Sequence, residues 1–165
     1  RPLHDIVAEI EKIVAHPPSE HWVNKSLQDT LYIGLHVIDK EILIDIVKKH
    51  CSMEGKRLYC EHLTQIYLGK KEIASVEVIA PGEKCLVTLD ALVINTDNGS
   101  AAFRATNIVA TNGQKVEIAT EKPHITALVA FGYKPSDSVS YVMKNDDSVS
   151  IFPLDLVVET ECVWN

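Results

Sequence analysis

From residue 58 onward, the chain alternates short β-type segments with glycine-containing turns, and this pattern constrains the fold more than any other feature. Strands that follow one another through short glycine turns pair mainly antiparallel. Turn signals stand at Gly69, Pro81-Gly82, Asp97-Asn98-Gly99 and Asn112-Gly113. The expected strands span residues 58–68, 73–79, 85–94, 101–108, 116–119, 124–131 and 156–163.

Helical patterns precede this β-rich part. The apolar residues between Leu3 and Val14 follow the three-and-four spacing of an amphipathic helix, which Pro17-Pro18 ends. A weaker helical pattern covers residues 19–28. An apolar run over residues 31–37 predicts a strand, after which Asp39 is suited to cap a helix that extends to about residue 50. Together these patterns predict the α+β class, with antiparallel strands and helices packed on the outside.

The size and hydropathy of the chain predict one globular domain. It has 165 residues, of which 46% are hydrophobic and 24% charged. No window approaches the roughly 18 consecutive apolar residues needed to cross a bilayer. Charged residues occupy the start of the chain, where a signal peptide would be apolar. We therefore expect no membrane partner and an intracellular protein, cytoplasmic or nuclear.

The cysteine and acidic residues give no sign of a metal site. The four cysteines show no CxxC spacing, which argues against a zinc knuckle and against a disulfide framework. We expect them to be reduced and mostly buried. The acidic residues at positions 146, 147 and 155 match no calcium-binding loop. No metal or other cofactor is expected. The cysteines are Cys51, Cys60, Cys85 and Cys162.

The net charge of −7 limits how this chain could bind RNA. Non-specific affinity for nucleic acid comes mainly from many Lys and Arg contacts with phosphate, so this charge argues against an extended electrostatic RNA-binding surface. The short basic pairs Lys56-Arg57 and Lys70-Lys71 are more typical of solvated strand ends than of an RNA path. An RNA substrate would have to be gripped locally, at its end.

Two segments of the chain resemble each other more closely than any others. Each has the form His-x-Thr inside an expected strand: one carries His62 and Thr64, the other His124 and Thr126. Because alternate residues of a strand share a face, the histidine and threonine of each motif project together while the residue between them faces the core. If the two strands lie side by side, one cleft receives two imidazoles and two hydroxyls.

Such a cleft is suited to phosphate transfer. Opening a cyclic phosphate needs a base that deprotonates water and an acid that protonates the departing oxygen. Histidine is the side chain whose ordinary pKa suits both tasks near neutrality. Threonine hydroxyls can hold the non-bridging phosphate oxygens. We therefore select His62, His124, Thr64 and Thr126 as the candidate catalytic residues, and the two threonines as phosphate ligands as well.

These motifs resemble the signature of the two-histidine phosphoesterase superfamily, and the opening strand from Tyr32 to Leu35 resembles that family's beginning. More narrowly, Lys122-Pro123-His124-Ile125-Thr126 followed by Gly132-Tyr133-Lys134-Pro135-Ser136 resembles the C-terminal cyclic phosphodiesterase domain of fungal tRNA ligases. The resemblance covers roughly residues 30 to 163. It implies a fold of two antiparallel β-lobes related by a pseudo-twofold axis and flanked by outer helices, each lobe carrying one motif.

The resemblance also implies an activity and partners. The expected enzyme is a metal-independent 2′,3′-cyclic phosphodiesterase that leaves a 2′-phosphate and a 3′-hydroxyl on tRNA exon halves during splicing and RNA repair. His124 would be the general base and His62 the acid. Residues 30–165 would form the catalytic core and residues 1–29 a helical junction. Because the chain begins with Arg1 rather than Met, we expect a larger polypeptide with neighbouring kinase and ligase domains.

Other residues near the motifs admit several interpretations. Tyr133 follows the second motif on a probable loop, where it could stack on a base or belong to a plain connecting turn; it is our candidate substrate-binding residue. Tyr59 alternates to the face opposite His62 and is expected in the core. The other histidines lack the motif and are expected to be structural or exposed. They are His4, His16, His21, His36 and His50.

Two alternative functions stay open. The chain could be a non-catalytic module of the same fold that binds RNA ends or docks neighbouring domains. The intact His and Thr of both motifs argue against this, because a module without activity would be expected to lose them first. It could also keep the catalytic centre and act on another substrate, such as a cyclic nucleotide, an ADP-ribose cyclic phosphate or an oligonucleotide cleaved from its end. Only the walls of the cleft would discriminate among these substrates.

Overall fold

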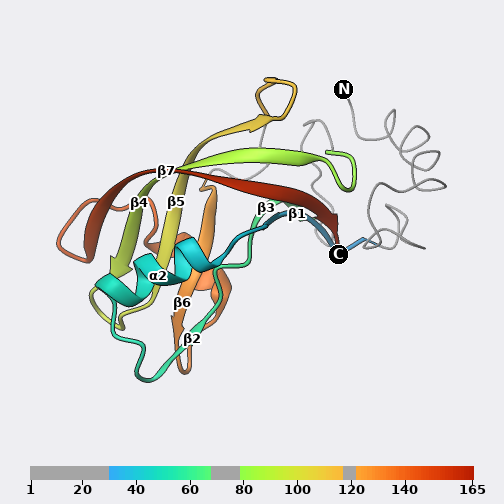
Figure 1. Ribbon diagram of the computed structural model, residues 1–165. Coiled ribbons are helices and arrows are strands. Elements are labelled where there is room, and N and C mark those ends of the chain that lie inside the picture. The colour runs from blue at the N-terminus through green and yellow to red at the C-terminus, as the bar shows by residue number, and fades with distance from the viewer. Residues whose placement is uncertain (1–29, 68–78, 117–121) are drawn as a thin grey trace.

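The computed structural model describes residues 30–67, 79–116 and 122–165 (Figure 1). The helices expected within residues 1–29, and most of the strands expected at 73–79 and 116–119, lie outside these residues. The described elements are β1 (Tyr32–Val37), α2 (Glu41–His50), β2 (Lys56–Leu58), β3 (His62–Tyr67), β4 (Lys84–Asn95), β5 (Ala101–Ala110), β6 (His124–Ala130), the 3-10 helix η3 (Pro135–Ser140) and β7 (Val149–Trp164).

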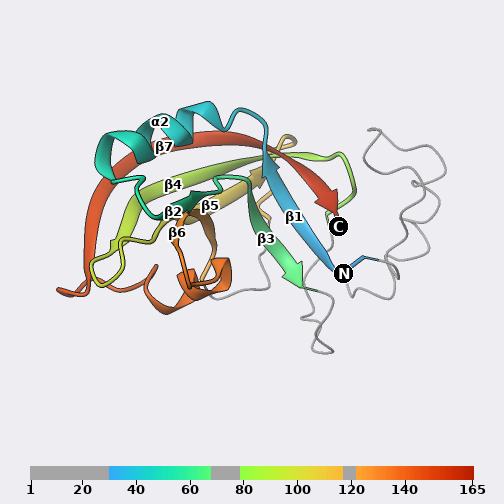
Figure 2. The ribbon, with the colours of Figure 1, turned by 90° about the horizontal axis from the view of Figure 1, so that it is seen from below.

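Six of the strands form a closed antiparallel barrel. Their order around the ring is β6-β3-β1-β7-β4-β5, and a further pairing between β5 and β6 closes it. The short strand β2 pairs with the last residues of β6, whereas β3 pairs with β6 near the start of β6. Strands β2 and β3 therefore lie along the same edge of β6. The expected antiparallel pairing therefore holds. Helix α2 lies outside the ring of strands (Figure 2).

This architecture shows that the expected two-lobed α+β fold with outer helices is wrong. The described residues contain one α-helix, α2, and the short η3, while strands make up most of the rest. The physical reason lies in β7, whose 16 residues pair with β4 over residues 149–161 and with β1 over residues 160–164. Because β5 and β6 also pair, β1-β3-β6-β5-β4 would otherwise be one open sheet, and this single long strand closes it into a ring.

The strand expected over residues 58–68 is interrupted. Cys60 adopts a positive φ of 58°, which breaks the chain between β2 and β3. The two halves still continue along β6, because the Tyr59 and Cys60 amides donate to the Ala127 and Thr126 carbonyl oxygens over 2.8 and 2.9 Å. A non-glycine residue in this conformation is uncommon. Here it turns the strand so that β3 begins at His62, in register for its own pairing.

The core fills the inside of the barrel. Leu63, Phe103, Ile125 and Trp164 are all at most 1% exposed and belong to one continuous cluster of buried side chains, to which α2 adds Leu43 and Val47. Each such side chain stabilises the fold by about 1.5–3 kcal/mol relative to exposure. The cysteines are free thiols, three of them buried, as expected. Within the described residues, no helix is long and apolar enough to span a membrane.

Candidate functional site

The structure brings the two His-x-Thr motifs together on neighbouring strands. Strands β3 and β6 pair antiparallel, with Leu63 opposite Ile125. Both of these residues are fully buried inside the barrel. Strand alternation therefore places the flanking histidines and threonines on the outer face, where all four are partly exposed. These four are His62, Thr64, His124 and Thr126.

Residues of the two outer strands extend this polar face on both sides. On β1, His36 lies opposite His62 and Gly34 lies opposite Thr64. On β5, Arg104 lies opposite His124. The Arg104 guanidinium is held by the Asp90 carboxylate, with Nε 2.8 Å from Oδ1 and Nη2 3.1 Å from Oδ2. The carboxylate offsets the charge of the guanidinium, so this pair forms a fixed wall beside His124 rather than an obvious phosphate ligand.

His62 stacks against two rings of β1. Its ring centroid lies 5.1 Å from that of Tyr32, at an interplanar angle of 26°, and 5.1 Å from that of His36, at 18°. Gly34 stands between these two positions on the same face of the strand. A Cβ atom there would lie 3.0 Å from Tyr32 Cε2 and 3.5 Å from His62 Cδ2. The absent side chain of Gly34 thus leaves room mainly for the Tyr32 ring that stacks on His62.

The last residue of the chain fixes the two rings that flank His62. The Asn165 amide nitrogen lies 3.1 Å from the Tyr32 hydroxyl and 3.2 Å from His36 Nε2. An amide NH2 group has two hydrogens to donate, so it can bond to both acceptors at once. Sequence reasoning assigned His36 a structural or exposed position and missed its contact with His62. The alternate positions of Tyr32, Gly34 and His36 in an expected strand could have indicated that these three residues share one face.

The two histidines of the motifs differ in their hydrogen bonds. His124 Nδ1 lies 2.8 Å from the Lys122 carbonyl oxygen. Since a carbonyl can only accept, Nδ1 carries the proton and Nε2 of the neutral ring is left with a lone pair. His62 Nδ1, in contrast, is buried and has no hydrogen-bond partner among the described residues. The tautomer of His124 is thus fixed by the backbone, and that of His62 is not.

Burial disfavours the charged form of both rings. Burial lowers the pKa of His62, and the charge of nearby His124 lowers it further. Burial also lowers the pKa of His124, against the opposing effect of its hydrogen bond to the Lys122 carbonyl. Desolvation disfavours the imidazolium form, and two like charges in one site disfavour each other. The effect of His124 on the pKa of His62 indicates that the two rings lie near each other.

Thr126 is connected to the 3-10 helix that follows β6. Its Oγ1 lies 3.2 Å from Ser138 Oγ and 3.4 Å from the Pro135 carbonyl oxygen. Ser138 is only 2% exposed. Since a carbonyl can only accept, Thr126 donates to Pro135 and accepts from Ser138, and a ligand oxygen would take the place of the Pro135 carbonyl as acceptor. Thr64 occupies the equivalent position on β3 and is half-buried.

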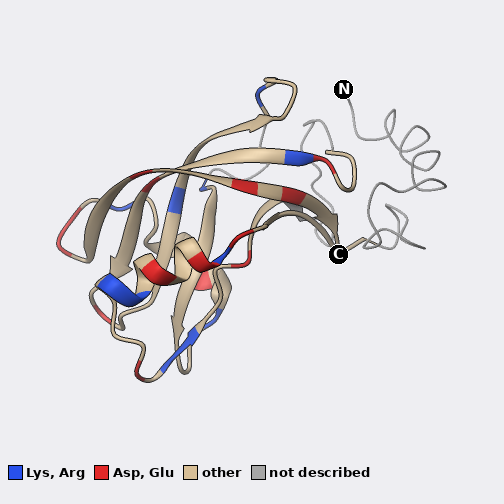
Figure 3. Ribbon diagram, in the orientation of Figure 1, with Lys and Arg blue, Asp and Glu red and all other residues tan. Residues whose placement is uncertain are grey.

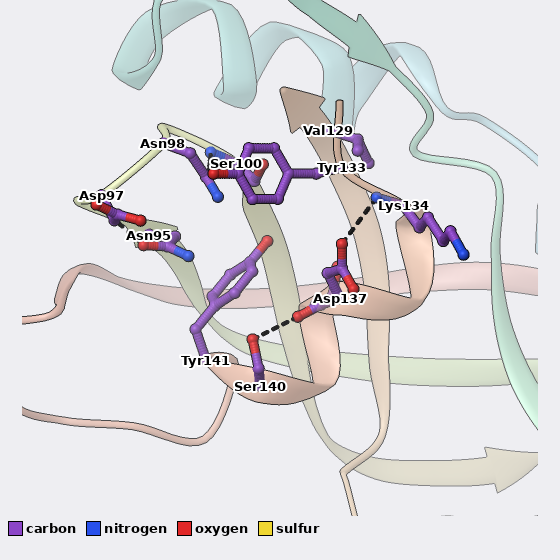
Figure 4. Close-up of a pocket in the computed structure, with 11 residues that line it drawn as sticks. Asn95, Asp97, Asn98, Ser100, Val129, Tyr133, Lys134, Asp137, Ser140 and Tyr141 are labelled. Atoms are coloured by element: carbon purple, nitrogen blue, oxygen red, sulfur yellow. Dashed lines mark hydrogen bonds between the residues drawn. The ribbon is translucent and has the colours of Figure 1, made fainter. Parts of the chain in front are cut away.

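The remaining sequence candidates lie apart from the histidine pair. Tyr133 is 48% exposed and lines a separate surface pocket, to which Ser138 also contributes (Figure 4). Lys56 and Arg57 pair with the end of β6 remote from His124. Lys70-Lys71 lie outside the described residues. Lys and Arg are scattered over several elements rather than gathered into one patch (Figure 3), and the described residues hold no cluster of potential metal ligands.

Comparison with known proteins supports the fold alone. No family model and no curated protein matches this chain. A solved structure of similar fold is the crystal structure of a fungal RNA kinase, with a TM-score of 0.53 and 14% sequence identity. The alignment covers 96% of this chain and 56% of that one. The chain therefore spans little more than half the length of the structure it matches.

Proposed function

We propose that this chain is a 2′,3′-cyclic phosphodiesterase that acts on RNA ends with a histidine acid/base pair and without a metal. The observation that carries the proposal is the position of the two His-x-Thr motifs: adjacent antiparallel strands present two imidazoles and two hydroxyls on one face. A phosphate held by the hydroxyls of Thr64 and Thr126 would lie between His62 and His124. That is the arrangement in which an acid and a base can act on opposite sides of one phosphorus atom.

His124 is the proposed general base. The neutral ring donates from Nδ1 to the Lys122 carbonyl, so its Nε2 lone pair is available to accept a proton. A water molecule gives this proton as its oxygen bonds to phosphorus. The resulting imidazolium is stabilised by the Lys122 carbonyl, which acts to raise the pKa of His124.

His62 is the proposed general acid. It donates a proton to the 3′ oxygen as the bond between that oxygen and phosphorus breaks, so the products are a 2′-phosphate and a 3′-hydroxyl. Burial lowers the pKa of His62 and so favours its neutral form. The negative charge of a bound phosphodiester favours the imidazolium, so substrate binding itself promotes protonation of His62. The flanking rings of Tyr32 and His36 hold the imidazole in place for this transfer.

The fungal RNA kinase of similar fold is consistent with a role in RNA processing. On this basis we extend the proposal to tRNA splicing and RNA repair. Residues 30–165 would be the catalytic core and residues 1–29 a junction to neighbouring kinase and ligase domains, with the exon halves of cleaved tRNA as substrates. In that setting the other domains would supply the electrostatic affinity for RNA that a net charge of −7 does not provide.

The test is hydrolysis of an RNA oligonucleotide that ends in a 2′,3′-cyclic phosphate, with EDTA present throughout. We expect a 2′-phosphate as the only phosphomonoester, identified by chromatography against both isomers. A 3′-phosphate would mean that the wrong oxygen was assigned as the leaving group. Binding of the oligonucleotide without any hydrolysis would instead favour a non-catalytic module that recognises RNA ends.

The dependence of kcat/KM on pH follows from the two lowered pKa values. The reaction needs His62 protonated and His124 neutral in the free enzyme. Because both pKa values lie below the ordinary 6.5, the protonated acid becomes scarce as the pH rises above that value. We expect a bell-shaped profile with its maximum below about pH 6.5. A maximum above neutrality would contradict the assignment.

A further inference from the structure

A second polar site lies next to the phosphate-binding face and has no role in the mechanism above. It is a surface pocket of about 330 Å³ between the β4–β5 turn and the segment that follows β6 (Figure 4). Its volume falls at the lower end of the range for small-molecule sites. It touches the phosphate-binding face through Ser138, whose hydroxyl contacts Thr126. The pocket is lined by Asn95, Asp97, Asn98, Ser100, Val129, Tyr133, Lys134, Asp137, Ser138, Ser140 and Tyr141.

Tyr141 provides the main indication that this pocket holds a ligand. The residue is only 3% exposed, and its hydroxyl points into the pocket (Figure 4). The hydroxyl makes no hydrogen bond of normal geometry with any described residue. Ser138 is near enough to oppose the effect of burial, which raises the pKa of Tyr141 to about 12, but its own hydrogen bond is with Thr126. A buried hydroxyl without a partner costs free energy, which a ligand atom would recover.

The charges around the pocket exclude a phosphate and favour an uncharged ligand with hydrogen-bond donors. Asp97 and Asp137 both line it, and the Lys134 ammonium points away (Figure 4). Asn95 and Asn98 use their side-chain oxygens to accept the Asp97 and Ser100 amides over 3.0 and 2.8 Å. Their NH2 groups thus remain as donors beside the two carboxylates. Such a mixture of donors and acceptors suits the polar edge of a planar heterocycle.

Tyr133 adds the flat surface that such a ring needs. Its side chain is 48% exposed at the mouth of the pocket, and exposed aromatic rings stack on nucleobases of any sequence. Stacking also gives affinity without positive charge, which fits an acidic chain. We propose that this pocket binds the nucleobase of the nucleotide whose phosphate lies at Thr126, with Tyr133 stacking on the base and Tyr141 bonding to its edge. The choice of ligand rests on the proposed function.

Binding alone tests this inference without requiring catalysis. Adenosine and cytidine carry no phosphate, so they report on the pocket and not on the histidine pair. We expect each to shift the backbone amide signals of residues 97–100 and 133–141 in NMR spectra of the intact chain, with a Kd on the order of millimolar. The Tyr141→Phe variant, which removes only the hydroxyl, should bind more weakly. Absence of shifts at about 20 mM nucleoside would overturn the inference, given such a Kd.

A kinetic comparison then separates the pocket from the reaction. The two substrates are adenosine 2′,3′-cyclic phosphate and the methyl riboside 2′,3′-cyclic phosphate, which lacks a base. Tyr133→Ala removes the ring on which the base stacks. It should therefore reduce the ratio of kcat/KM for the adenosine substrate to kcat/KM for the substrate without a base by about 5- to 100-fold. The control is Phe131→Ala, an exposed aromatic residue nearby that does not line the pocket.

The outcomes distinguish the two proposals. Equal kcat/KM for the two substrates, with no nucleoside shifts, would overturn the nucleobase pocket and leave the phosphodiesterase intact. Nucleoside shifts at residues 97–100 and 133–141, with hydrolysis of neither substrate, would support the pocket and overturn the proposed reaction.

Discussion

Replacement of His124 by alanine is expected to lower kcat/KM for hydrolysis of a 2′,3′-cyclic phosphate by about 10²- to 10⁴-fold, the contribution usual for a positioned acid or base. His62→Ala should cause a loss of the same order. The physical reason is that each ring moves one proton in the transition state, and water in its place is neither positioned nor of suitable pKa. Steady-state kinetics with the RNA oligonucleotide in EDTA measures both losses.

The two variants can be told apart by the leaving group. In a substrate whose 3′ bridging oxygen is replaced by sulfur, the thiolate departs without protonation, so the acid is no longer needed. We expect this substitution to restore much of the activity of His62→Ala and little of that of His124→Ala. The reverse pattern would exchange the two roles. His50→Ala serves as the matched control. His50 lies on α2 against Phe152, with ring centroids 4.4 Å apart, and not on the strands that carry the two His-x-Thr motifs.

Truncation of Phe103 should produce the largest loss of stability. Its side chain is fully buried, and the residue lies opposite Ile125 in the pairing of β5 with β6 that closes the barrel. Phe→Ala substitutions in a packed core lower the free energy of unfolding by about 3–5 kcal/mol, because burial is lost and a cavity remains. Denaturant unfolding followed by circular dichroism measures the change as a shift of the midpoint.

Phe131 offers the same substitution in an exposed setting. It is 69% exposed in the turn after β6, so Phe131→Ala should change the free energy of unfolding by no more than about 0.5 kcal/mol. A loss of no more than about 0.5 kcal/mol for Phe103→Ala as well would contradict the packing of this ring in the closed barrel. A large loss for Phe103→Ala alone would support its position in the closed barrel.

Local sequence patterns predicted individual strands better than their arrangement. The runs at 31–37, 85–94, 101–108 and 124–131 correspond to β1, β4, β5 and β6, because alternation and turn residues are local signals. The run at 156–163 underestimated β7, which begins at Val149 and continues through Pro153. Proline usually interrupts a strand pattern, so the length that closes the ring was hidden. The two-lobed expectation came from the resemblance to the two-histidine phosphoesterase superfamily, and the local patterns held no evidence of ring closure against it.

The candidate site shows the same limit. Strand alternation placed His62 with Thr64 and His124 with Thr126 from the sequence alone, since two residues of one strand two apart must share a face. The contact of His36 with His62 depends on the pairing of β1 with β3, which no local pattern specifies. The contact of Ser138 with Thr126 depends on how the chain turns after β6. The catalytic roles themselves stay predictions until they are measured.

The position of β7 in the ring has a consequence for how the protein is made. Strand β7 lies between β1 and β4, and Ile33 pairs with Trp164, so the barrel cannot close before residues 149–164 are free to pair. Contacts between such distant parts of the chain make folding slow, on the order of milliseconds to seconds. Until then, the edges of β1 and β4 remain open to wrong partners. The rings beside His62 also wait for Asn165, so catalytic competence and completion of the fold should arise together.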